Sequence, residues 1–361
     1  PIIGEIEFAS WFTKSPIIAI TGSNGKSTMV KMLYEIFSKK FKNVYLGGNI
    51  GISFSKNVLN ELKNNYKECI HILEISSFQL ETIFTFKPEI SCILNVSKDH
   101  MDRYKNVNEY FNTKTNITKN ICKKSHIVYN QDDKKLHNYY KKFSTSIPYS
   151  LKKKNNLCYS ESKNIFSNNN EIIINQNDTN LIGNHNLQNI LAAITIAKFY
   201  KIKNSHIKSS LKGFNPLPHR MEKINLNNKL NFINDSKSTN IYSTISAIKS
   251  FEKKIILILG GYSKKEIEYK LIKSSINKDK IIEIICYGEA GEKLTPKIKK
   301  IKPVLYFKFF KDAVIQSIKF ATKENIILLS PAFKSFDQFN NFEERGNDFK
   351  KTIKGFYYNE K

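Results

Sequence analysis

Residues 21–28 read T-G-S-N-G-K-S-T, the composition of a loop that binds phosphate groups. Glycines let a backbone wrap around an anion, and the first N–H groups of a following helix can point toward phosphate oxygens. Lys26 would reach the terminal phosphates of a nucleotide, and Ser27 would bind Mg²⁺. The common loop, G-x-x-x-x-G-K-[ST], has its first glycine where this chain has Ile20, so this loop is shorter. An ordinary glycine-rich turn is the alternative, and G-K-S-T before a helix disfavours it.

Two later apolar runs end in side chains that suit metal ions. In "ILEISSFQLE", Glu74 follows such a run, where α/β folds place ligands and a carboxylate can bind Mg²⁺. Capping a helix is the alternative role, and it suits Ser76 or Ser77 better. In "ILNVSKDHMDRY", His100 could bind a second metal ion or assist an attacking amine. A single histidine is more often structural, but its place at the mouth of a third strand of the same sheet favours the functional role.

Polar side chains in the second half could complete a nucleotide site. Asn186 and Asn189 lie one helical turn apart and could meet an adenine edge, or simply cap a helix. Arg220, Asp235 and Lys237 lie after a linker and at the end of an apolar run. Their charges could stabilise a phosphoryl group during transfer, although each could also be an ordinary turn residue.

Alternating apolar runs and helical patterns must position these residues. Such alternation is typical of a mostly parallel sheet covered on both faces. Strands are expected in a first domain at 16–21, 43–48, 69–76 and 89–96, and in a second at 230–236, 253–261, 280–288, 302–307 and 324–332. The fold class is therefore α/β, with a P-loop-type central domain followed by a Rossmann-like domain.

Three segments interrupt or join these domains. Residues 144–182 are polar and asparagine-rich with short apolar runs, which predicts an antiparallel excursion on the first domain. A helix is expected over 184–200. The segment 212–220 carries two prolines and a glycine, which is the strongest linker signal in the chain.

Composition limits the classes of protein to consider. The 361 residues suggest about two domains. The net charge of +26 raises the question of a nucleic-acid partner, but lysines are spread along the chain with few arginines, so none is expected. No run approaches the ~20 apolar residues of a membrane span, and the first residues lack a signal-peptide pattern. Five scattered cysteines without a C-x-x-C pair favour a reducing cytoplasm.

Taken together, the motifs resemble those of the Mur ligases, ATP-dependent amide-bond ligases of peptidoglycan synthesis. The loop T-G-[ST]-N-G-K-[ST] of that family matches residues 21–27, so the short loop is the family's own form. S-S-F-Q-L and D-Q-F-x-N-F-E-x-R-G are specific to members that add D-glutamate. The other matching motifs, in order, are GGNIG (47–51), EISSFQLE (74–81), NVSKDHMDRY (95–104), HNLQN (185–189), LPHRME (217–222), NDSKSTN (234–240) and LSPAFKSFDQFNNFEERG (329–346).

The resemblance implies an ADP-forming ligase that joins D-glutamate to UDP-N-acetylmuramoyl-L-alanine through an acyl phosphate. ATP and two Mg²⁺ ions would be required. The residues implied to bind ATP are Gly22, Ser23, Asn24, Gly25, Lys26, Ser27, Thr28, Asn189, Arg220 and Asp235. Those implied to bind Mg²⁺ are Ser27, Glu74 and His100. Those implied to bind the muramoyl substrate or D-glutamate are Asn49, Lys237, Thr239, Lys264, Ser335, Phe336 and Phe342. The catalytic set would be Lys26, His100, Lys114 and Lys237.

Lys114 lies where the family carries a carbamylated lysine, a modification that replaces a cation with an anion. The alternative is a plain surface lysine in a lysine-rich chain. The resemblance also divides the chain into 1–15, the remnant of an N-terminal domain or a linker, 16–215, the ATP-binding domain, and 216–361, the C-terminal domain. Only the tail of the family's UDP-binding domain is therefore expected here.

Two other functions remain open at this stage. The chain could be another ligase of the superfamily, such as a folylpolyglutamate synthetase, or a truncated ATP-binding remnant without activity. A cytoplasmic monomer is expected in each case.

Overall fold

The computed structural model describes residues 2–65, 68–101, 103–154, 157–224, 226, 230–263, 269–276 and 279–358. The chain forms two compact units, Pro1–Asn215 and Pro216–Lys361, and each is described by itself. None of the described helices is both long and apolar enough to cross a membrane.

The first unit is built on a six-stranded sheet in which every neighbouring pair is parallel. Its order is β2-β3-β1-β4-β5-β6, so β2 and β6 are the end strands. The strands are β1 (Ile17–Thr21), β2 (Asn43–Gly48), β3 (Cys69–Glu74), β4 (Ile90–Ile93), β5 (His126–Asn130) and β6 (Ser146–Tyr149). The expected parallel sheet is confirmed, and its four expected strands are joined by β5 and β6.

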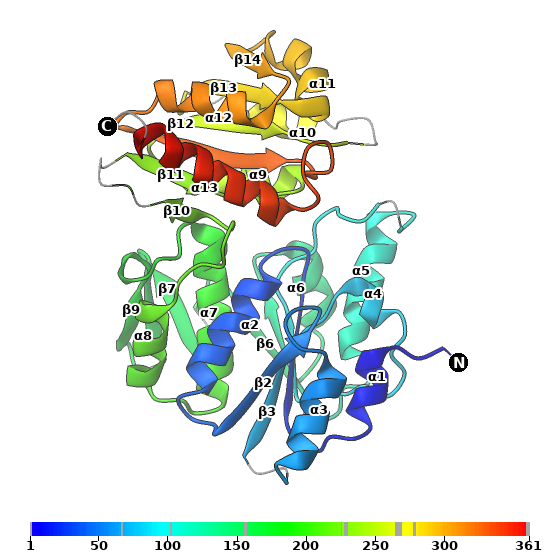
Figure 1. Cartoon of the computed structure of the whole chain (residues 1–361). Coiled ribbons are helices and arrows are strands. Elements are labelled where there is room, and N and C mark those ends of the chain that lie inside the picture. Colours follow the sequence, from blue (N-terminus) through cyan, green and yellow to red (C-terminus); the bar gives the residue numbers. More distant parts are fainter. Residues whose placement is uncertain are drawn as a thin grey trace. The chain divides into compact units, whose positions relative to one another are not determined.

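Helices cover both faces of this sheet (Figure 1). They are α1 (Glu5–Ser10), α2 (Lys26–Phe37), α3 (Phe54–Lys63), α4 (Ser77–Leu80), α5 (Val107–Thr115), α6 (Lys134–Tyr140), α7 (Asn184–Phe199) and α8 (Asn204–Gly213), with 3₁₀ turns η1 (Asn116–Thr118) and η2 (Gln176–Asp178).

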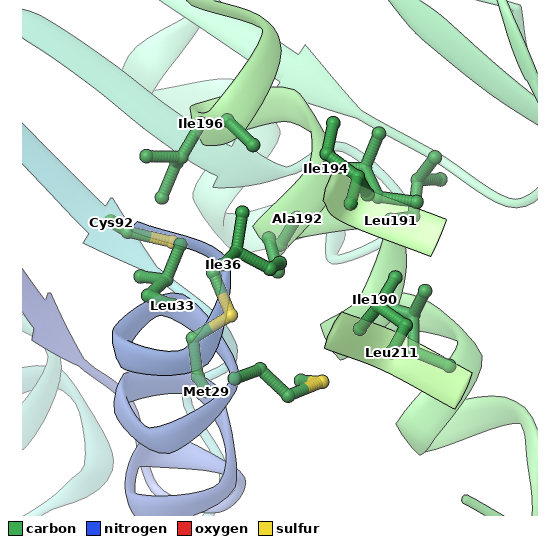
Figure 2. Close-up of a cluster of buried hydrophobic side chains, with 14 of the residues drawn as sticks. Met29, Leu33, Ile36, Cys92, Ile190, Leu191, Ala192, Ile194, Ile196 and Leu211 are labelled. Carbon is green, nitrogen blue, oxygen red and sulfur yellow. The ribbon is translucent and has the colours of Figure 1, made fainter. Parts of the chain in front are cut away.

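Successive β1 residues point to opposite faces, as the pleat requires. Ile18 and Ile20 pack with α2, α7 and α8, whereas Ile17 and Ala19 pack with α1, α3, α5 and α6. Figure 2 shows how Met29 and Leu33 of α2 meet the apolar side chains of α7. Because helices cover both faces, every residue of β1 is buried and the strand is a continuous apolar run. Its last residue, Thr21, leads directly into the phosphate loop.

The asparagine-rich segment departs partly from expectation. Its first apolar run is β6, which joins the main sheet in parallel beside β5. The antiparallel excursion is confirmed only from β7 onward, as β7 (Cys158–Glu161), β8 (Asn164–Ser167) and β9 (Ile172–Asn175). Cys158 and Ile165 enter the same core as α7, which explains why so polar a segment still folds onto the first unit.

The second unit has a mixed six-stranded sheet of order β10-β11-β15-β12-β13-β14, in which only β10 and β11 pair antiparallel. Its strands are β10 (Glu222–Ile224), β11 (Asn231–Asn234), β12 (Lys254–Gly260), β13 (Ile281–Tyr287), β14 (Val304–Phe307) and β15 (Asn325–Ala332). Its helices are α9 (Ile241–Lys249), α10 (Tyr269–Ile276), α11 (Gly288–Ile298), α12 (Phe310–Lys319) and α13 (Phe342–Tyr358). The expected Rossmann-like domain is confirmed.

Candidate active site

The phosphate loop connects β1 to α2 and is built around two glycines. Gly25 is the N-cap of α2 and has φ of +88°, a left-handed conformation that favours glycine. The Lys26 ammonium folds back over the loop, where its Nζ donates to the Gly22 carbonyl at 2.7 Å and the Ser23 carbonyl at 3.2 Å. A cation thus lies beside the N-terminus of a twelve-residue helix, which is an arrangement suited to phosphate.

The remaining expected loop residues follow the same path. Ser27 and Thr28 are buried in the first turn of α2, and Ser23 is buried before it. Asn189 of α7 packs closely against the loop at Gly25. A Cβ built on Gly25 would lie only 2.9 Å from the Asn189 Oδ1. Asn186, one turn earlier, instead donates to the Ile182 carbonyl at 2.9 Å, which is a local role at the start of the helix.

Glu74 ends β3, next to β1 in the sheet. The Asn49 amide donates to its Oε1 at 2.9 Å, and its Oε2 is buried without a hydrogen-bond partner. A buried carboxylate oxygen without a donor is costly, and a divalent cation would satisfy it. The expected helix cap is separate from this site, since Ser76 and Gln79 form a capping box at α4.

Lys114 is a buried lysine on α5 rather than a surface one, with a relative exposure of 1%. Its Nζ donates to the Gly22 carbonyl at 3.1 Å and lies 4.6 Å from the centre of the Tyr110 ring. Burial, and then the charge of Lys26, lower the pKa of Lys114 well below its usual value, whereas Asp99 and Glu74 raise it. The unprotonated amine is the form that reacts with CO₂, so the environment suits carbamylation.

His100 lies in the segment after β4, with a side chain 43% exposed. Its backbone has a positive φ of 55°, and its N–H donates to the Asp99 carboxylate at 3.0 Å. The ring packs edge-on against Phe78 at 5.0 Å and tilts toward Tyr110 at 6.1 Å. Among the described residues, no three His, Cys, Asp or Glu side chains gather to hold a metal ion by themselves, so phosphate oxygens and water would have to complete the coordination of Mg²⁺.

Tyr110 is a residue of this site that sequence reasoning missed. It is buried, its hydroxyl oxygen lies 3.3 Å from Ser23 Oγ, and its ring lies beside both His100 and Lys114. Tyr110 and Lys114 are four residues apart on α5, so they share one helix face. In the sequence, this four-residue spacing from Lys114 is the signal that could have indicated Tyr110.

In the second unit, Asp235 follows β11 and is buried. It accepts from the Ser330 hydroxyl at 2.9 Å and from the Met221 N–H at 3.2 Å. Burial raises the pKa of Asp235 to about 7, although Ser330, Met221 and the charge of Arg220 act to lower it. Arg220 and Asp235, both expected nucleotide contacts, are thus coupled electrostatically.

The expected D-glutamate residues fall into two groups in this unit. The Lys237 ammonium lies 3.6 Å from the centre of the Phe342 ring, and the N–H of Thr239 donates to the Lys237 carbonyl at 2.9 Å. Ser335 is buried at the start of a turn, and Phe336 after it is 60% exposed. Lys264 lies outside the described residues.

Arg345 was also missed, and it connects these two groups. It is fully buried on α13. Its guanidinium donates to both the hydroxyl and the carbonyl of Ser236, at 3.0 and 2.8 Å, and to the Tyr287 hydroxyl and the Phe333 carbonyl, each at 3.1 Å. It therefore ties the segment that carries Lys237 to the segment that carries Ser335.

Comparison with known proteins places this architecture in a family. Residues 20–197 match the Mur ligase middle domain, and residues 219–333 match the Mur ligase glutamate ligase domain. The chain belongs to the Mur ligase family.

Individual relatives are more specific. A protein of Christiangramia forsetii named UDP-N-acetylmuramoylalanine–D-glutamate ligase is 35% identical, over 98% of this chain and 80% of its own length. A protein of Buchnera aphidicola with the same name is 40% identical, over 98% and 78%. The crystal structure of MurF from Thermotoga maritima in complex with ADP has a TM-score of 0.70, with 15% identity over 97% of this chain and 83% of that one. It shares the fold.

Proposed function

We propose that this chain is the ligase that adds D-glutamate to UDP-N-acetylmuramoyl-L-alanine with ATP in the cytoplasm. The supporting observation is the match, at 35–40% identity over 98% of the chain, to relatives that carry this name. The half-buried Lys26 and the buried Glu74 and Lys114 around one phosphate loop agree with it. A folylpolyglutamate synthetase-like ligase or an inactive remnant is less well supported, because both of these relatives are named as D-glutamate ligases.

The first step transfers the γ-phosphoryl group of ATP to the substrate's carboxylate. A carboxylate oxygen attacks the γ-phosphorus, the bond to the β-phosphate oxygen breaks, and ADP leaves an acyl phosphate behind. Lys26 and the N–H groups at the start of α2 would stabilise the negative charge on the moving phosphoryl oxygens. The nucleotide would also be held by Asn189, which packs against the loop.

Ser27, Glu74 and His100 would hold Mg²⁺. The Asn49 amide binds Oε1 of Glu74 and so orients the carboxylate, which leaves Oε2 for the metal ion. The metal ions, when bound, neutralise phosphate charge. Carbamylation of Lys114 would join its amine to CO₂ with release of a proton. The neutral Lys114 amine beside Lys26 would then become an anion, which would attract the Lys26 cation and Mg²⁺.

The second step forms the amide. The unprotonated amine of D-glutamate attacks the acyl carbon, and the tetrahedral intermediate expels inorganic phosphate. In the second unit, Lys237, Thr239, Ser335, Phe336 and Phe342 would bind D-glutamate, the Lys237 cation pairing with a carboxylate. Arg345 would keep their two segments in register.

Phosphate release with ATP and UDP-N-acetylmuramoyl-L-alanine tests this function. D-Glutamate should support turnover, whereas L-glutamate, L-alanine and diaminopimelate should not. Lys26→Ala should lower kcat/KM by ~10²-fold or more, because a contact to transferring charge is lost. Turnover with L-glutamate and a folate would favour the other ligase, and ATP binding without any turnover would favour the inactive remnant.

A further inference from the structure

The segment that leaves β4 runs directly against the phosphate loop. The Leu94 N–H donates to the Thr21 carbonyl at 3.0 Å, which continues the ladder between β1 and β4 beyond their ends. A Cβ built on Gly22 would lie 3.1 Å from Leu94 Cβ and 3.3 Å from the Asn95 carbonyl oxygen. A side chain at residue 22 would therefore press against this segment, and the φ of +155° there also favours glycine.

Asn95 makes three hydrogen bonds to the backbone of this loop. Its carbonyl accepts from the Ser23 N–H at 2.9 Å. Its side-chain Oδ1 accepts from the Asn24 N–H at 2.9 Å, and its Nδ2 donates to the Asn24 carbonyl at 3.0 Å. The amide thus pairs with both polar backbone groups of Asn24, as a neighbouring strand would.

A second contact strengthens the same junction. The Ser23 hydroxyl donates to the Ser97 carbonyl at 3.0 Å and accepts from the Ser97 N–H at 3.0 Å. Residues 23 and 24 are therefore both fixed by the segment 95–97, which continues to His100. Ser23 and Asn24 are the only residues between Gly22 and Gly25, whereas the common P-loop has four residues between its two glycines.

We propose that Asn95 is a positioning residue that holds the shortened loop in its nucleotide-binding shape from outside, through its amide pairing with Asn24. The inference rests on the proposed function only in taking a nucleoside di- or triphosphate as the ligand. A loop fixed before binding loses less conformational freedom when it closes on phosphate, so the pairing contributes affinity without contacting the nucleotide.

Calorimetric titration of the full chain with ADP and Mg²⁺ tests the role of Asn95. Asn95→Ala removes both side-chain bonds, and Asn95→Asp keeps the shape but cannot donate to the Asn24 carbonyl. The matched control is Asn120→Ala, because the Asn120 amide donates to two backbone carbonyls, Phe84 at 2.7 Å and Phe86 at 3.0 Å, in the same unit.

Both Asn95 variants should bind ADP about tenfold more weakly or worse, while Asn120→Ala should bind like the wild type at a similar loss of Tm. Wild-type affinity in either folded Asn95 variant, or equal weakening in Asn120→Ala, would overturn the proposal. Absence of ADP binding by the wild type would instead refute the nucleotide part of the proposed function.

Hydrogen exchange of the unmodified chain gives a readout that does not depend on any variant folding. Without nucleotide, the Ser23 and Asn24 N–H groups should exchange slowly, since both donate to Asn95. Exchange of both amides at the rate of an open loop would overturn the proposal.

Discussion

Single side chains set the charge of the phosphate site, and two of them are lysines close to one carbonyl. Lys26 and Lys114 both donate to the Gly22 oxygen. Two ammonium groups at that spacing repel each other, so one of them is more stable without its proton. Lys114 is the buried one, and burial together with the charge of Lys26 lowers its pKa well below its usual value.

We therefore expect Lys114 to carry a carbamate. In buffer with ¹³C-labelled bicarbonate, the wild type should show a carbamate carbon resonance that Lys114→Arg lacks, because a guanidinium does not form one. Lys114→Arg should also lose most ligase activity, since it keeps a cation where an anion is needed. A labelled protein without this resonance would contradict the expectation.

Asp235 provides a second residue-scale prediction. Its pKa is about 7 in the folded chain and about 4 when unfolded, so folding takes up a proton between these values. Its contribution to stability is full below pH 4 and is lost as the pH rises through 7. Asp235→Asn should remove this loss, making the variant the more stable protein at pH 8, by at most about 4 kcal/mol.

Urea unfolding of both proteins at pH 5 and pH 8 measures the difference. The difference in free energy of unfolding between Asp235→Asn and the wild type should be larger at pH 8 than at pH 5. An equal gap at the two pH values would show that Asp235 titrates normally.

The sequence predicted these residues unequally. The loop 21–28 and Glu74 could be found because each follows an apolar run, and the end of such a run marks a strand end. Tyr110 left only its four-residue spacing to Lys114 as a signal. Asn95 and Arg345 left none, because their roles depend on contacts with residues far away in the chain; Ser236, for example, lies 109 residues before Arg345. Only folding brings those partners together.

At the scale of elements, α1 is held by a buried carboxylate. Glu7 accepts from the N–H groups of Phe84, Thr85 and Phe86 at 2.8–2.9 Å and from the Thr85 hydroxyl. Burial raises its pKa, but these donors together lower the pKa of Glu7 to about 2. The short helix, too short to be stable alone, is therefore anchored by these hydrogen bonds in addition to the packing of Ile6 and Ala9 in the core.

Glu7→Gln should destabilise the first unit by about 1–3 kcal/mol at pH 7, because the bonds to a charged acceptor are lost. The wild-type advantage is present above pH 4.5 and should disappear as the pH falls toward 2. Denaturant unfolding measures it, with Glu35→Gln on the exposed face of α2 as control. Equal effects of the two changes would contradict this role for Glu7.

Most elements with strong apolar runs were predicted to within one or two residues, as for β2 and β12, but β4 ends at Ile93, three residues before the expected end at 96. The short strands β5 and β10 were not singled out. Three to five residues carry too little periodicity, and pairing with a neighbour decides their state. The same reason explains β6, whose four residues were assigned to the excursion but pair with β5.

At the scale of the whole molecule, the net charge of +26 acts on every substrate, since ATP, D-glutamate and the UDP-linked acceptor are all anions. A positive field raises the rate at which anions reach the protein, and salt screens it. We expect kcat/KM to fall severalfold between about 50 mM and about 500 mM KCl, with kcat changing less. A flat kcat/KM would show that the lysines are too dispersed to steer substrates.

The end strand β6 has a consequence for how the protein behaves at high concentration. The Ile127 N–H donates to the Thr145 carbonyl, and the Gln131 N–H to the Tyr149 carbonyl, so Pro148 faces away from β5. Proline has no N–H to offer an incoming strand. A second chain therefore cannot complete a ladder along this edge, which makes the β6 side of the sheet resistant to intermolecular β-pairing.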